Sequence, residues 1–139
     1  MKRGPTEVNR PEDTTTSVTV LIATRGRPES LIHSLRSVLE CEYPAFEVLV
    51  IDQSPPEQRG WIPTDPRLRR IASSTIGKSR ALNEGLAMLT SEFVAFTDDD
   101  CTVPPGWLQR AVDVLAQEPD AAIVAGASVA PSSGTSPAS

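Results

Sequence analysis

The sequence predicts an α/β fold, a mostly parallel sheet with helices packed on its faces. Two observations lead to this prediction. Short apolar segments rich in β-branched residues alternate with segments whose apolar residues recur at helical spacing. This alternation is typical of parallel strands joined by right-handed crossovers. With 139 residues, the chain has the length of one ordinary domain.

The first half of the pattern is strand, helix, strand. Residues 18–23 form a near-continuous apolar run, which is typical of a strand buried on both faces. Pro28 then begins a helix whose apolar residues share one face. Those residues are Leu31, Leu35 and Val38. Pro44 ends this segment, and residues 46–51 predict a second strand.

The second half follows a polar, proline-rich connection at residues 53–66. A short third strand is expected at 68–71 and a fourth at 93–96, with a helix at 79–89 between them. A third helix is indicated by apolar residues at helical spacing, and a fifth strand by a final apolar run. The helix carries Leu108, Ala111, Val112 and Leu115, and the run covers residues 121–125.

The two ends lack apolar periodicity and are rich in Pro, Ser and Thr. Segments of this kind cannot bury enough apolar surface to offset the entropy of ordering. We therefore expect disorder at residues 1–16 and 131–139, and one folded domain at residues 17–130.

Composition narrows the classes of function. The net charge of −5 argues against nucleic acid as a partner. The sequence has neither an apolar stretch long enough for a bilayer nor the apolar region of a signal peptide. Cys41 and Cys101 lie far apart and fit a reducing compartment, so we expect a cytoplasmic protein. Three acids precede Cys101 and disfavour its thiolate, so we do not expect a nucleophile there.

Three consecutive carboxylates, Asp98, Asp99 and Asp100, follow the strand at 93–96. At the carboxyl end of a buried strand such a cluster can face a crevice, where a hard divalent cation offsets the repulsion. The alternative is a solvated group that caps the next helix. Three acids in a row exceed what capping needs, which favours a metal that holds the phosphates of a nucleotide.

Polar residues also follow the other predicted strands, and ligands of open parallel sheets bind at these carboxyl ends. Arg25 could stack on a base or pair with a phosphate, and otherwise is a solvated arginine. Asp52 could accept hydrogen bonds from a base or a ribose, or could simply form a turn. Residues 77–80 begin a helix, where free amides favour an anion. Neither a Walker A spacing nor a GxGxxG motif is present.

These segments, taken in order, resemble the N-terminal half of a family-2 glycosyltransferase. The matching stretches are Thr24-Arg25, Ile51-Asp52, residues 77–85, residues 96–100 and Pro105-Gly106-Trp107-Leu108. The resemblance covers roughly residues 17–130. It implies a Rossmann-like GT-A half-domain that transfers a sugar from a UDP- or GDP-linked donor with Mg²⁺ or Mn²⁺.

The resemblance also implies roles for individual residues. Thr24, Arg25 and Asp52 would hold the base and ribose, and Arg80 would help to hold the pyrophosphate. Asp98 and Asp100 would form the DxD pair, with Asp98 facing the ribose or the metal and Asp100 binding the metal. Asp99 could share this work, because three consecutive aspartates leave the register open by one.

Family members continue past this point with segments that bind the acceptor and supply a catalytic base, and the sequence offers no candidate for that base. We therefore expect an incomplete transferase, with an uncovered apolar edge that invites a second copy or a partner chain. The alternatives are a non-catalytic nucleotide-sugar-binding module and a nucleotidyltransferase-like enzyme. The latter usually carries a Gly-rich basic loop after the first strand, and residues 24–27 match such a loop poorly.

Overall fold

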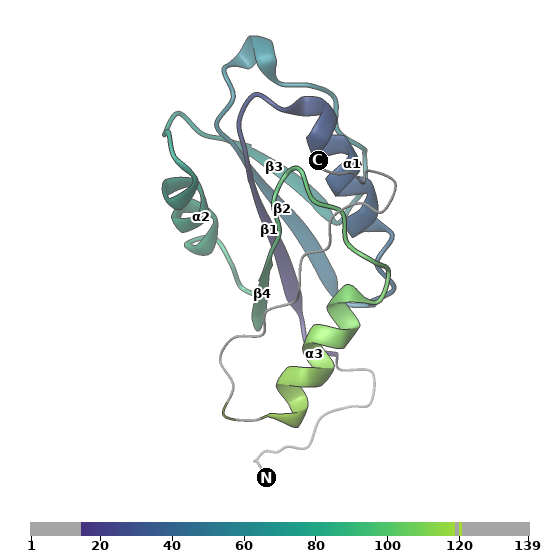
Figure 1. Ribbon diagram of the computed structural model, residues 1–139. Helices are drawn as coiled ribbons and strands as arrows, with labels where there is room; N and C mark the ends of the chain where they lie inside the picture. The colour runs from purple at the N-terminus through teal and green to yellow at the C-terminus, as the bar shows by residue number, and fades with distance from the viewer. Residues whose placement is uncertain (1–14, 119, 121–139) are drawn as a thin grey trace, which may run out of the picture.

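A four-stranded parallel sheet runs through the computed structural model, which describes residues 15–118 and 120 (Figure 1). The strands lie in the order β3-β2-β1-β4, and every pairing between neighbours is parallel. Their bounds are β1 Val18–Thr24, β2 Phe46–Asp52, β3 Leu68–Ala72 and β4 Phe93–Phe96. The predicted fold class and these strands are confirmed. The fifth strand expected at 121–125 and the segments 1–14 and 131–139 lie outside the described residues.

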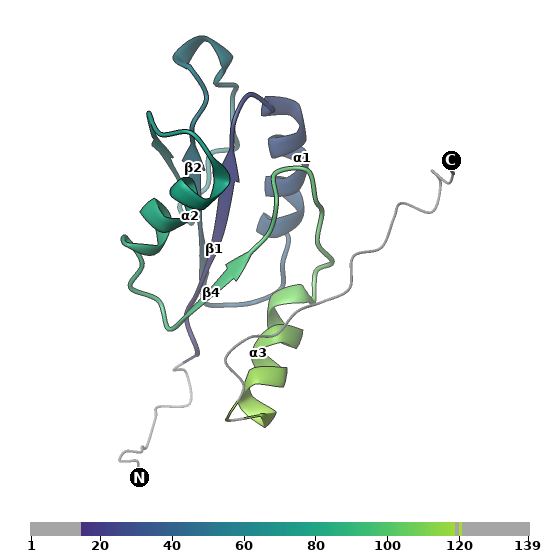
Figure 2. The ribbon, with the colours of Figure 1, turned by 60° about the vertical axis from the view of Figure 1, so that its left-hand side comes forward.

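Helices cover both faces of the sheet. On one face lie α1 (Pro28–Leu39) and α3 (Trp107–Gln117), and on the other lies α2 (Lys78–Leu86) (Figure 2). A short 3₁₀ turn, η1 (Pro56–Gln58), interrupts the polar connection after β2. The expected helix at 79–89 ends at Leu86, because the chain tightens into i→i−3 hydrogen bonds from Met88 and Leu89.

Strand β1 is the centre of the core because alternate side chains face opposite layers. Val20 and Ile22 pack toward α1, whereas Leu21 packs toward α2, and all three are 0% exposed. On the α2 side, Gly85 gives β1 room for close approach, since a Cβ at this glycine would lie 2.4 Å from a methyl carbon of Leu21. The sheet and α2 are therefore held at a fixed spacing.

Helix α1 anchors the loop that follows β4. Ser34 is completely buried, and its hydroxyl donates to the backbone oxygen of Asp98 at 3.0 Å. One turn later, the Ser37 hydroxyl oxygen accepts from the Val103 amide at 3.1 Å. These bonds draw the loop along α1 and fix the backbone at which the acids begin.

Strand β4 has one neighbour, β1, among the residues that the structure describes. Phe93 and Phe96 on this strand are 38% and 49% exposed. The described sheet therefore leaves an apolar edge open to solvent at β4.

Candidate functional site

An open polar cavity of about 370 Å³ lies at the carboxyl ends of β1, β2 and β4, as predicted for a parallel sheet. Its lining combines residues that follow these strands with the first residue of α2. The lining residues are Ala23, Thr24, Arg25, Arg27, Gln53, Gly77, Lys78, Asp98, Asp99 and Asp100. The segments singled out in the sequence thus converge on one site.

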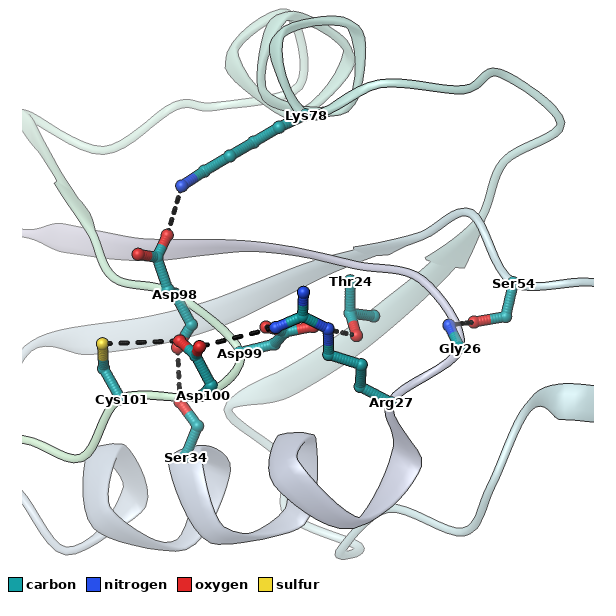
Figure 3. Close-up of polar contacts among 10 residues, drawn as sticks. All are labelled: Thr24, Gly26, Arg27, Ser34, Ser54, Lys78, Asp98, Asp99, Asp100 and Cys101. Atoms are coloured by element: carbon teal, nitrogen blue, oxygen red, sulfur yellow. Dashed lines mark hydrogen bonds and ion pairs between the residues drawn. The ribbon is translucent and has the colours of Figure 1, made fainter. Parts of the chain in front are cut away.

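The three aspartates point in different directions, as Figure 3 shows. Asp99 is buried, at 7% exposure, and turns toward the end of β1. One of its oxygens accepts a hydrogen bond from the Thr24 hydroxyl at 2.8 Å, and the other lies 3.5 Å from the Arg27 guanidinium. Asp99 therefore connects the loop that carries the three aspartates, the acid loop (residues 97–101), to β1, whereas its two neighbours remain open to solvent.

Asp98 and Asp100 are the exposed pair, and each has a cationic partner in the cavity wall. The Lys78 ammonium donates to Asp98, and Arg27 lies 3.4 Å from Asp100 (Figure 3). Oxygens of Asp98 and Asp100 and the sulfur of Cys101 all lie within 4.8 Å of one another. One cation could bind both carboxylates at this spacing.

The donor atoms test whether Mg²⁺ or Mn²⁺ suits this position. Two carboxylates that are about half exposed, at 48% and 54%, fit hard cations that keep several waters and bind through few protein ligands. Partial desolvation and the hydrogen bond to Asp100 raise the pKa of the Cys101 thiol, so it is a weak ligand and a poor nucleophile. The residues present therefore fit Mg²⁺ or Mn²⁺.

Positively charged side chains line the cavity wall opposite the three aspartates. The hydrogen bond to Asp98 raises the pKa of Lys78, which keeps its ammonium protonated at neutral pH. Arg25 is exposed and lines the cavity, so it is free to meet a ligand. The cavity thus presents both carboxylates for a cation and basic groups for an anion.

Asp52 is nearly enclosed, at 2% exposure, and does not line the cavity. Its carboxylate accepts from the Ser54 amide at 2.8 Å and lies 3.7 Å from the Arg70 guanidinium. The next residue, Gln53, faces the cavity instead. The side-chain Nε2 of Gln53 donates to the backbone oxygen of Gly77 at 2.9 Å, which ties β2 to the start of α2.

Helix α2 begins at Lys78 after Gly77, whose φ of 108° lies in the region that only glycine adopts without strain. Within the described part of the chain, no side chain hydrogen-bonds to the N-terminus of this helix as a cap. Arg80, which the sequence analysis assigned to the pyrophosphate, is exposed near this turn but does not line the cavity.

Three cavity residues with polar side chains were not among the assigned site residues: Arg27, Gln53 and Lys78. Each lies within three residues of an assigned position. A long side chain next to a strand end or a helix start is the signal that could have identified them. Which of these neighbours faces the cavity depends on the local backbone direction, which spacing alone does not give.

Comparison with known proteins identifies the family. The model of glycosyl transferase family 2 matches residues 19–137. The chain belongs to glycosyl transferase family 2. The Haloferax volcanii glucosyl-dolichyl phosphate glucuronosyltransferase is 31% identical over 115 residues, which cover 79% of this chain and 37% of that protein.

Solved structures agree with this placement. The mannosyltransferase PcManGT from Pyrobaculum calidifontis, in complex with GDP-Man and Mn²⁺, has a TM-score of 0.62 and 26% identity over 83% of this chain and 38% of its own. The S. aureus protein TarS, in complex with UDP-GlcNAc, has a TM-score of 0.60 and 21% identity over 73% of this chain and 32% of its own. The fold is therefore the GT-A fold of these glycosyltransferases.

The chain spans about a third of the length of these similar proteins. Among the residues that the structure describes, no helix is long and apolar enough to cross a membrane.

Proposed function

We propose that this chain supplies the donor site of a family-2 glycosyltransferase, which binds a UDP- or GDP-linked sugar together with Mg²⁺ or Mn²⁺ and transfers the sugar. The observation that carries the proposal is the convergence of Asp98 and Asp100 oxygens in a polar cavity at the strand ends. The family match supports it, as does the similarity to a mannosyltransferase solved with GDP-Man and Mn²⁺.

In this proposal Asp98 and Asp100 hold the cation, which when bound would offset the charge that develops on the departing diphosphate. Thr24 and Asp99 contribute by holding the acid loop, because their hydrogen bond fixes the loop against β1. The exposed Arg25 lines the cavity, which supports a contact between its guanidinium and the base or ribose.

The assignments of Thr24 and Asp52 to the base or ribose and of Arg80 to the pyrophosphate stay predictions. For direct contact, Asp52 must turn away from Ser54 and Arg70, which now occupy its oxygens. Arg80 must reach from the exposed surface of α2 into the cavity. The alternative for Asp52 is an indirect role, in which it holds the turn that presents Gln53.

Sugar transfer also needs an acceptor and, for an inverting reaction, a general base near its hydroxyl. The only carboxylates that line the cavity in the described residues are the three aspartates. Asp98 and Asp100 are assigned to the cation, and Asp99 is bonded to Thr24. We propose that the base comes from elsewhere, either another segment or a partner chain over the open β4 edge. Without it, the described residues would form a nucleotide-sugar-binding module, which is the second candidate function.

A cytoplasmic location is also our proposal. It is supported by two free cysteines, Cys41 and Cys101, which persist as thiols in a reducing compartment.

Isothermal titration of the chain with UDP, GDP and ADP, each with and without Mn²⁺, tests the donor site. We expect UDP or GDP to bind when Mn²⁺ is present and to bind much more weakly without it. Absence of binding by every nucleotide in the presence of Mn²⁺ would refute the proposed function. A radiolabelled donor assay then separates the two candidates, since a transferase moves the sugar to an acceptor and a binding module does not.

A further inference from the structure

The cavity holds its own cations against its carboxylates. Lys78 enters from the first residue of α2 and donates to Asp98, which belongs to the loop after β4 on the opposite wall (Figure 3). Arg27, just before α1, spans Asp99 and Asp100 at 3.5 and 3.4 Å. Two cationic side chains from separate elements therefore lie against three consecutive carboxylates.

Lys78 has a fixed base and a movable end. Gln53 bonds the backbone of Gly77, so the residue that precedes Lys78 is tied to the end of β2. The Lys78 side chain itself is 61% exposed, and Asp98 is the acceptor that the structure gives its ammonium. Since exposed ion pairs are weak, the ammonium can leave Asp98 at little cost.

The ammonium and a divalent cation would compete for the same carboxylate. A cation bound by Asp98 and Asp100 would lie beside the Lys78 ammonium, and like charges at this separation repel. When a diphosphate is also bound, the ammonium and the cation no longer compete. The diphosphate oxygens accept hydrogen bonds from the ammonium that the cation has displaced from Asp98.

On the basis of the proposed function, we propose that Lys78 is a built-in counter-ion that disfavours a bare divalent cation at Asp98 and moves to the diphosphate when cation and diphosphate arrive together. Lys78 then couples the two ligands, so that each binds more tightly in the presence of the other. The site in this way selects the metal–diphosphate complex over the free metal.

The test compares wild type with Lys78→Met, Lys78→Arg and the control Arg69→Met. Arg69 is exposed on β3, at the opposite edge of the sheet from β4, so its loss changes the net charge without changing the cavity. Binding of MnCl₂ alone is measured from the paramagnetic resonance signal of free Mn²⁺. Binding of inorganic pyrophosphate in the presence of Mn²⁺ is measured by titration calorimetry, which avoids any dependence on the base.

In Lys78→Met we expect the affinity for Mn²⁺ alone and the affinity for pyrophosphate with Mn²⁺ to change in opposite directions. Mn²⁺ alone should bind about fivefold more tightly, the scale of one exposed ion pair, while pyrophosphate with Mn²⁺ should bind about tenfold more weakly. Lys78→Arg should retain most of the exclusion of Mn²⁺, and Arg69→Met should match wild type in both measurements.

The inference is wrong if the Lys78→Met variant binds Mn²⁺ alone no more tightly than wild type does. This holds even if wild type binds UDP or GDP together with Mn²⁺. A loss of pyrophosphate binding without a gain in Mn²⁺ binding also overturns it, because Lys78 would then be only a phosphate ligand. The proposed function is judged separately, by the nucleotide titration of wild type.

Discussion

The hydrogen bond between Thr24 and Asp99 holds the acid loop against β1, and its contribution to stability can be measured. Thr24 is 5% exposed and Asp99 is 7% exposed, so water has little access to either side chain. The Thr24→Val substitution keeps the shape of the side chain but removes the donor. One oxygen of a nearly enclosed carboxylate then loses its 2.8 Å partner.

The expected loss of stability in Thr24→Val follows from the charge of the carboxylate that accepts the hydrogen bond. A hydrogen bond to a charged group contributes about 1.5–3 kcal/mol to stability. Arg27 remains 3.5 Å from the other Asp99 oxygen and compensates in part. We therefore expect a loss of about 2 kcal/mol in the free energy of unfolding, and each kcal/mol corresponds to about 4 °C in Tm for a domain of somewhat more than a hundred residues.

A matched control lies on the same strand. Thr19 is 2% exposed, and its hydroxyl donates to the Ser91 hydroxyl at 2.8 Å, a bond between neutral groups. Thr19→Val should cost only about 0.5–1.5 kcal/mol. Both variants are measured by urea unfolding followed by circular dichroism. If Thr24→Val costs no more than Thr19→Val, the bond to Asp99 does not hold the loop and the reasoning is wrong.

Three further predictions test other parts of the structure. Gly85→Val should destabilise the fold by about 1–3 kcal/mol in urea unfolding, because the Cβ of the new valine would collide with the buried Leu21 of β1. An unchanged midpoint of unfolding would contradict this close packing. Arg67 lowers the pKa of Asp65 to about 2, so this carboxylate stabilises the fold above its unfolded pKa near 4 and the contribution disappears as the pH falls toward 2. Asp65→Asn should therefore flatten the thermal stability profile between pH 4 and pH 2, and a profile as steep as wild type would exclude the effect. Since Asp100 helps to raise the pKa of the Cys101 thiol, Asp100→Asn should speed alkylation by iodoacetamide at pH 7.5, and an unchanged rate would show that the carboxylate does not suppress the thiolate.

Much of the fold could be predicted because the local signals agree with the tertiary packing. The apolar runs at β1 and β2 are buried on both faces, so nearly every residue in them is apolar and the strands are easy to recognise. The apolar spacing predicts that α2 extends to Leu89, but the helix ends at Leu86. Leu86 and Met88 are exposed, and Leu89 packs against the core from outside the helix. Apolar spacing alone does not show where burial ends.

The site could be predicted at the level of segments but not of side chains. Parallel strands bring their carboxyl ends together, which is why the residues after β1, β2 and β4 meet. Whether Asp52 or Gln53 faces the cavity depends on the alternation of side chains at the end of β2. Asp52 accepts from the amide of Ser54, two residues on, which is the turn that the sequence analysis gave as its alternative role. Its ion pair with Arg70 joins residues on different strands, and the sequence does not reveal that pairing.

The most direct test of the donor site is the effect of Asp100→Asn on nucleotide diphosphate binding, measured by calorimetry with and without Mn²⁺. The control is Asp113→Asn, which removes a carboxylate from the exposed side of α3 and leaves the cavity intact. We expect UDP or GDP to bind wild type and Asp113→Asn much more tightly with Mn²⁺ than without it, and in the presence of Mn²⁺ to bind Asp100→Asn about 1–3 kcal/mol more weakly than wild type. Binding that needs no metal and is equally strong in Asp100→Asn would contradict this expectation.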